Sequence, residues 1–349
     1  MTSYPKPSPP PQVFPQIGAI LHLDTTLGYP YPGVELGNKH WQLDGSCVLV
    51  APDRILTIRH TLGKTAAGAA FFPYEGLVPL DDERVEDYGY GDALCLCRLK
   101  WPLRFARPFE YEHVSRERME TAIVGGYGQW SGLDGWDRDG VQRSAEVKLR
   151  QPGQEPGKID DGDNLDLQWT STWNQGLAAG RNNSGGALLF PRPDGLTLVG
   201  VSRETKGATQ AASRIAHNRA TDWLPSQLKL ALRQPPVDPI AREPARELLV
   251  RHDLPGVAER FAVPLGATGV RLTLSATAGL RLQMGIGGPG DETELLAGLC
   301  ASDESSGRFL YRKERLAEGA SEIVVGVARV ERAPREQEQV RAQLCCMFI

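Results

Sequence analysis

The sequence predicts an all-β protein made of more than one compact unit, on three observations. Short apolar runs recur over residues 17–230 with Gly, Pro and Asp between them, a pattern typical of short strands joined by turns. Over residues 247–349 apolar and polar residues alternate with period two, which predicts a β-sandwich of about 100 residues. The 349 residues, 41% of them hydrophobic, suffice for two or three hydrophobic cores.

Residues 1–16 are Pro-rich and predicted to be extended, as a linker or as a docking peptide for an aromatic groove. They contain no apolar run of signal-peptide length, and no later segment is long and apolar enough to span a membrane. A strand would place Cys95 and Cys97 on the same face, without the geometry of a disulfide, and no cysteine lies next to His60. These features predict a reduced, cytoplasmic setting. The net charge of −4 gives no indication of a nucleic-acid partner.

Three separated segments carry a histidine, an aspartate and a serine in surroundings that suit nucleophilic catalysis. His60 follows an apolar strand, Asp92 precedes one, and Ser184 lies in a Gly-rich loop before another. A serine hydroxyl is a poor nucleophile until an imidazole takes its proton, and that imidazole needs a carboxylate to hold its tautomer. Each segment alone is typical of a turn, a cap or a strand boundary, whereas their order, spacing and context together predict a catalytic triad.

The order His, Asp, Ser, on these segments, resembles that of the trypsin/chymotrypsin family of serine peptidases, and the resemblance extends over about residues 17–230. Further matching segments are Ala122–Gly128 (a strand ending in a Gly-aromatic-Gly turn), Leu196–Ser202 (the strand flanking the substrate) and Ile215–Leu230 with Trp223 and Leu224 (the terminal helix). The resemblance implies a double six-stranded β-barrel with a C-terminal helix. It also implies a serine endopeptidase in which His60 is the base, Asp92 orients it and Ser184 is the nucleophile.

The same resemblance implies an oxyanion hole made by the backbone amides of Asn182 and Ser184. The family normally has Gly at the first of these positions, so the chain departs from the pattern there. It departs again at Asn183, where secreted members have an Asp that receives the new N-terminal ammonium after zymogen cleavage. Because an amide cannot form that ion pair, we expect that cleavage before Ile17 is not the activating step.

The residues that resemble the family's substrate pocket leave the specificity open. Ala178, six residues before Ser184, occupies the position of the pocket floor, so the acid that selects Arg or Lys in trypsin is absent and a small or apolar side chain would be preferred. Ser202 and Glu204 fall on the pocket wall, where Glu204 would favour a basic side chain. Alternatively, Glu204 is a solvated loop residue beside basic neighbours.

The domain boundaries follow from the prolines. We predict a peptidase domain over residues 17–232, a linker over residues 233–246 that begins at a Pro-rich stretch, and the β-sandwich over residues 247–349. The last of these weakly resembles the pre-peptidase C-terminal domains that accompany bacterial peptidases. Its role would be either recognition of a substrate or partner, or stabilisation of the chain.

The sequence therefore predicts a bacterial serine endopeptidase that acts on protein substrates inside the cell and is restrained by a partner or ligand. The alternative is a catalytically silent protein of the same fold that binds or scaffolds. A third reading is a defence effector that a sensor protein activates through the C-terminal domain. No cofactor and no metal are predicted: a calcium-loop pattern near Asp137 and Asp139 has Gly135 at its first ligand position and no flanking helices.

Overall fold

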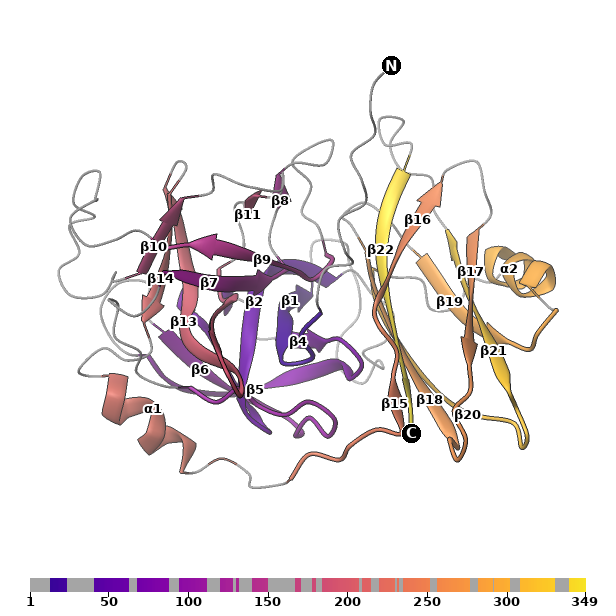
Figure 1. Ribbon diagram of the computed structural model, residues 1–349, viewed down its shortest axis with the longest axis horizontal. Helices are drawn as coiled ribbons and strands as arrows, with labels where there is room; N and C mark the ends of the chain where they lie inside the picture. Colours follow the sequence, from indigo (N-terminus) through magenta and orange to yellow (C-terminus); the bar gives the residue numbers. More distant parts are fainter. Residues whose placement is uncertain are drawn as a thin grey trace, which may run out of the picture.

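A computed structural model describes the chain over residues 13–23, 41–62, 68–87, 94–111, 120–127, 130–131, 140–149, 167–170, 178–179, 184–206, 209–214, 220–229, 231, 235–251, 256–276, 282–290, 292–301, 308–329 and 339–349. Within these ranges strands dominate, so the prediction of an all-β protein is confirmed. The strands form three groups along the chain (Figure 1).

The first group is a closed six-stranded barrel in the order β1-β2-β3-β6-β5-β4. Its interior holds apolar side chains from all six strands, among them Ile20, Leu49, Ile55 and Phe72. The register pairs Ile17 of β1 with Val48 of β2, so the first described strand is part of the barrel wall. The strands are β1 (Ile17–Leu23), β2 (Trp41–Ala51), β3 (Arg54–Ile58), β4 (Gly68–Phe72), β5 (Gly76–Asp87) and β6 (Leu94–Leu99).

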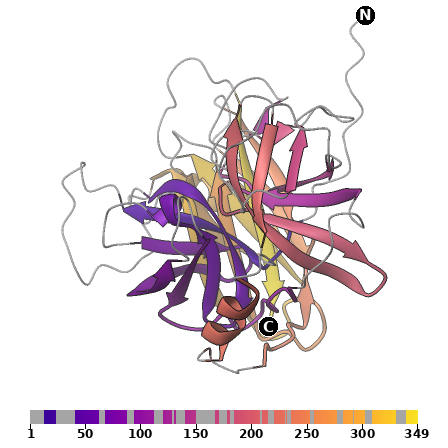
Figure 2. The ribbon, with the colours of Figure 1, turned by 90° about the vertical axis from the view of Figure 1, so that its left-hand side faces the viewer.

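The second group is a six-stranded sheet in the order β10-β14-β13-β12-β7-β9, beside the barrel in Figure 2. Its edge strands β9 and β10 come within 8 Å of each other between Cα atoms, so the sheet curls toward closure. A short pair, β8 with β11, accompanies it. The strands are β7 (Thr121–Gly126), β8 (Trp130–Ser131), β9 (Arg143–Lys148), β10 (Leu167–Thr170), β11 (Ala178–Ala179), β12 (Ala187–Arg192), β13 (Gly195–Lys206) and β14 (Thr209–Arg214).

Helix α1 (Ala220–Leu228) follows this sheet, inside the segment where a helix is predicted. Its Leu224 is buried in a core that lies between the first two groups and includes Val48 and Leu56 of the barrel and Leu198 of the sheet. Phe14 belongs to the same core, so part of the Pro-rich segment is built into the fold.

The third group is a β-sandwich of a five-stranded and a three-stranded sheet. Their facing side chains form one core, to which Leu272, Leu274, Val325 and Leu344 contribute. The five-stranded sheet contains β15 (Ala241–Arg242), β16 (Arg246–Arg251), β18 (Gly269–Ala276), β20 (Phe309–Arg315) and β22 (Gln339–Phe348). The three-stranded sheet contains β17 (Gly256–Ala262), β19 (Leu282–Gly287) and β21 (Glu322–Arg329).

The sandwich also contains a helix that the alternating pattern did not predict, α2 (Glu292–Ala301), at its outer edge in Figure 1. Gly285 and Gly326 lie on the outer face of the three-stranded sheet, and a Cβ at either would come within 3.0 Å of Leu295. The missing side chains therefore make room for the helix. Period two is a pattern of strands, so it predicted a β-sandwich and gave no sign of the helix. The strands of the sandwich also begin earlier than predicted, with β15 inside the predicted linker of residues 233–246.

The outer face of the five-stranded sheet packs against the barrel rather than facing water. In β18 the residues that alternate with the core leucines are Arg271 and Thr273, and both point toward the β4–β5 turn. The Tyr74 amide donates to Thr273 Oγ1 at 3.1 Å, and Arg271 Nη1 lies 3.1 Å from Glu75 Oε2. Burial raises the pKa of Glu75, and hydrogen bonding by the Phe105 amide and the charge of Arg271 oppose that rise.

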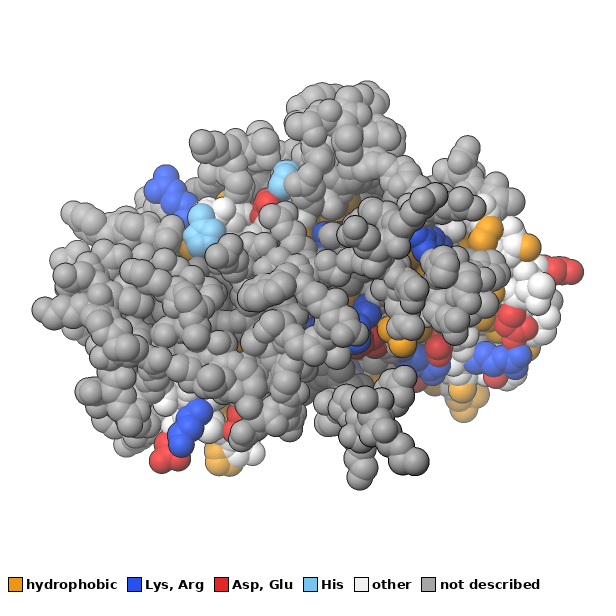
Figure 3. Space-filling model, turned by 90° about the horizontal axis from the view of Figure 1, so that it is seen from above, with side chains coloured by type: hydrophobic (Ala, Val, Ile, Leu, Met, Phe, Trp, Pro, Cys, Tyr) orange, Lys and Arg blue, Asp and Glu red, His pale blue; other side chains and the backbone are white. Residues whose placement is uncertain are grey.

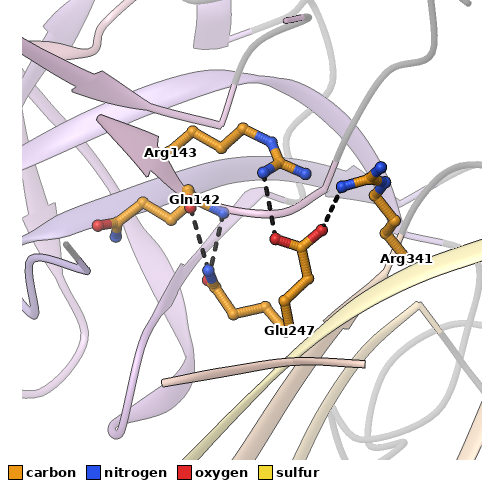
Figure 4. A network of polar contacts seen from close by, with 5 residues as sticks. Gln142, Arg143, Glu247 and Arg341 are labelled. Atoms are coloured by element: carbon orange, nitrogen blue, oxygen red, sulfur yellow. Dashed lines mark hydrogen bonds and ion pairs between the residues drawn. The ribbon is translucent and has the colours of Figure 1, made fainter. Parts of the chain in front are cut away.

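A second set of polar contacts joins β9 to the same sheet (Figure 4). Glu247 lies between two guanidiniums, with Oε2 at 3.3 Å from Arg143 Nη1 and Oε1 at 2.6 Å from Arg341 Nη1. Burial disfavours the charged form of Glu247, but the two arginines outweigh this and lower its pKa. Beside them, the Gln142 amide donates to Gln343 Oε1 at 3.2 Å and Gln343 Nε2 donates to the Gln142 carbonyl at 3.0 Å.

Candidate active site

His60 lies in a 3₁₀ turn, Arg59–Leu62, directly after β3. All five residues of β3 are buried, so the strand holds the start of this turn in the barrel wall. Two threonines tie the turn down: Thr61 Oγ1 donates to the Ile58 carbonyl at 2.6 Å, and it lies 2.8 Å from Thr57 Oγ1. Thr57 Oγ1 in turn donates to the Ser46 carbonyl of β2 at 2.7 Å. The imidazole itself is exposed at the surface.

Ser184 begins a tight turn that leads into β12. Gly185 has φ +85°, and its amide donates to the Ser202 carbonyl at 2.7 Å, while the Ser202 amide donates to the Gly186 carbonyl at 2.7 Å. The Ser184 carbonyl accepts from the Ser46 amide at 2.8 Å. A Cβ on Gly185 would lie 1.8 Å from the Ser46 carbonyl oxygen, so glycine alone permits this approach.

The serine and histidine segments meet at Gly45 of the barrel. A Cβ built on Gly45 would lie 2.6 Å from the Ser184 carbonyl oxygen and 2.7 Å from Thr61 Cγ2. The residue after His60 and the candidate nucleophile therefore border the same glycine, although they come from different sheets and lie more than a hundred positions apart in the chain. The absence of a side chain at Gly45 leaves the space into which both segments fit.

Two of the predicted site residues, Asp92 and Asn182, lie outside the described residues, as does Asn183. The register of the adjacent strand β6 indicates where the chain on either side of Asp92 joins the barrel. Leu94 of β6 pairs with Ile58 of β3 in an antiparallel ladder, so the chain enters β6 at the same end of the barrel at which it leaves β3 for His60.

Of the three predicted pocket residues, the structure describes the side chain of Ser202 alone. Ser202 is buried, and its backbone is bonded to the turn that follows Ser184, as described above. Ala178 lies in β11 opposite Ser131, and Glu204 lies in β13 just after a register shift, but their side chains are outside the described part of the chain. The structure therefore brings Ser202 to the site and leaves the specificity reading of Ala178 and Glu204 as a prediction.

Sequence reasoning assigned no role to Ser46, which connects the parts of the site. Its amide and carbonyl bond to Ser184 and Thr57, and its Oγ accepts from the Tyr127 amide at 2.8 Å. The available signal was a serine directly before the apolar run of residues 47–51 in the same strand.

Sequence reasoning also missed a contact between a histidine of β1 and an aspartate of β2. His22 Nδ1 contacts Asp44 Oδ2, with the two side chains 25% and 23% exposed. Asp44 directly precedes Gly45. Viewed from above, histidine side chains reach the surface of the barrel half of the molecule beside acidic and basic side chains (Figure 3).

Some further predictions concern the rest of the chain. No disulfide joins the cysteines of the described residues, and the Sγ atoms of Cys95 and Cys97 lie 3.9 Å apart on one face, as predicted. Among the residues that the structure describes, no group of three or more His, Cys, Asp or Glu is placed to hold a metal. No helix in the described ranges is long and apolar enough to cross a membrane.

Of the comparisons with known proteins, the one with solved structures gives a match. No protein-family model matches the chain, and no curated protein matches it. Among solved structures it is similar to one titled HL collagenase, with a TM-score of 0.46 and 14% sequence identity, over 64% of this chain and 98% of the collagenase. A likeness of this degree assigns neither a family nor an activity.

Proposed function

We propose that the chain is a serine endopeptidase with a trypsin-like arrangement of His60, Asp92 and Ser184. The observation that carries this proposal is the meeting of the serine and histidine segments at Gly45. Backbone bonds hold the turn at Ser184 and Gly185 against β2 and β13, so the serine is fixed beside the segment that carries the base.

In this mechanism the Ser184 hydroxyl attacks the scissile carbonyl while His60 takes its proton, and the backbone amides of Asn182 and Ser184 stabilise the oxyanion. His60 then gives the proton to the leaving amine, which forms the acyl-enzyme. Water attacks this ester with His60 again as base, and Ser184 is regenerated. Asp92 holds the tautomer of His60 throughout. The pocket formed by Ala178, Ser202 and Glu204 would select the side chain before the cleaved bond.

The second candidate is a catalytically silent binding or scaffold protein of the same fold. The feature that favours it is the pair Asn182 and Asn183 in the nucleophile loop, where the family has Gly and Asp. For the endopeptidase, we also propose regulation by a partner or ligand, because a peptidase inside the cell must be restrained.

The deciding experiment is intact-mass spectrometry after treatment of the full chain with a fluorophosphonate probe. One adduct is expected on the wild type and none on Ser184→Ala. His60→Ala should slow labelling by about 10³-fold or more, because the base is lost. The matched control is His22→Ala, which removes the other histidine–carboxylate pair and should label at the wild-type rate. A wild type that stays unlabelled, alone and with candidate partners, supports the silent protein instead.

A further inference from the structure

Phe309, the first residue of β20, is the sandwich's contribution to a cluster on the outside of the barrel. The cluster also contains Phe71 and Tyr127, and all three rings are at most 1% exposed. The Phe71 and Phe309 ring centroids are 5.2 Å apart, and Phe71 meets Tyr127 edge-on at 6.5 Å and 86°. The position of the Tyr127 ring therefore depends on a chain of ring contacts that ends in the C-terminal sandwich.

Tyr127 connects this cluster to the candidate nucleophile through its backbone. Its amide donates to Ser46 Oγ at 2.8 Å, and the Ser46 amide donates to the Ser184 carbonyl at 2.8 Å. Ser46 is completely buried, so close packing around it restricts its movement relative to its neighbours. Two hydrogen bonds therefore connect the backbone of Tyr127, through Ser46, to Ser184.

The sandwich is held to the barrel by hydrogen bonds, which allows it to support the ring of Tyr127. Gln343 makes reciprocal hydrogen bonds with the backbone of Gln142. The side chain of Gln142 donates to the carbonyls of Phe14 and Ile17 at 3.0 and 2.8 Å and accepts from the Phe14 amide at 2.6 Å. The sheet that carries Phe309 is thus bonded to the first strand of the barrel.

We propose that Phe309 is a positioning residue for Ser184, and that the C-terminal sandwich is an integral part of the catalytic unit. This inference rests on the proposed function for its catalytic consequence, while the mechanical coupling from Phe309 to Ser46 stands independently of it. The sandwich supports the ring of Tyr127, Tyr127 orients Ser46, and Ser46 holds the carbonyl of Ser184.

The test compares Phe309→Ala with Phe261→Ala in the full chain. Both phenylalanines are 1% exposed and belong to the sandwich, but Phe261 lies in its internal core, away from the barrel. Fluorophosphonate labelling is measured against probe concentration and pH, below the melting temperature of both variants. For Phe309→Ala the maximal labelling rate should fall by about 10-fold or more, with the half-saturating concentration and the pH midpoint unchanged. Phe261→Ala should stay within about twofold of the wild type.

A second readout is hydrogen exchange over residues 41–51, which reports the Ser46 amide and its bond to Ser184. Exchange should accelerate in Phe309→Ala alone, and Phe309→Leu, which also serves if the alanine variant does not fold, should restore part of both effects. Equal slowing of labelling in both variants, or unchanged exchange at Ser46, overturns the proposal. If the wild type is never labelled, the proposed function fails, and the exchange measurement still decides the coupling.

Discussion

Gly185→Ala tests whether the turn at the candidate nucleophile depends on a close backbone approach. A Cβ at this position would lie 1.8 Å from the Ser46 carbonyl oxygen and 2.4 Å from Thr57 Oγ1, whereas real Cβ contacts essentially never fall below 3.0 Å. The turn would have to move away from β2. Both backbone bonds that position it, Gly185 N to Ser202 O at 2.7 Å and Ser46 N to Ser184 O at 2.8 Å, would stretch or break.

The magnitude follows from these contacts. An L-residue at φ +85° costs about 1–2 kcal/mol, and the two weakened hydrogen bonds cost about 1 kcal/mol each. We expect Gly185→Ala to lower the free energy of unfolding by about 3–4 kcal/mol and the labelling rate of Ser184 by about 100-fold.

The matched control is Gly266→Ala. Gly266 has nearly the same φ, +88°, but a Cβ there would meet nothing within 4 Å. It should cost about 1–2 kcal/mol and leave labelling unchanged. The assays are thermal unfolding by circular dichroism and the fluorophosphonate labelling rate. If the two variants lose the same stability and both label normally, the close approach at Gly185 is not what restricts this position to glycine.

Two further predictions concern pH and the contact between barrel and sandwich. The folded pKa of Glu247 is lowered below 4.5, so its contribution to stability is present above that pH and is lost as the pH falls through and below it. Glu247→Gln should therefore lower stability by about 1–2 kcal/mol at neutral pH and flatten the acid side of the stability curve, and an unchanged acid limb would contradict the reasoning. The folded pKa of Glu75 is raised above 4.5, so its contribution is present below that pH and decreases as the pH rises. Arg271→Met removes the cation beside it and should cost about 3 kcal/mol near pH 7 but much less near pH 4, as melting curves at the two pH values would show; equal losses would refute it.

Much of the fold could be predicted from local pattern. Period-two alternation predicted a β-sandwich in the C-terminal part of the chain, and apolar runs next to His60 and Ser184 predicted that both residues lie at strand ends. Helix α2 was missed because its three leucines are outnumbered by the strand signals on either side. The glycines that make room for it, such as Gly326, gain their meaning only once the helix is placed on the sheet.

The face of β18 shows the limit of such a pattern. Alternation of this kind is typical of a strand with one face in water, yet Arg271 and Thr273 on its polar face both contact the barrel. Alternation establishes that two faces of a strand differ, and it does not say which surroundings the polar face meets. A polar face can be buried when each of its groups finds a partner, as Thr273 does at the Tyr74 amide.

By itself, the sequence determined the order His60, Asp92, Ser184. It also determined the strand periodicity and the glycines that permit tight turns, because these depend on residues close together in the chain. Only the tertiary structure decided that Ser184 meets the turn of His60 at Gly45, and that Ser46 links both to Tyr127. Those contacts depend on how separate sheets pack against one another. The dense packing of the interior, rather than local conformational preference, selects one such arrangement.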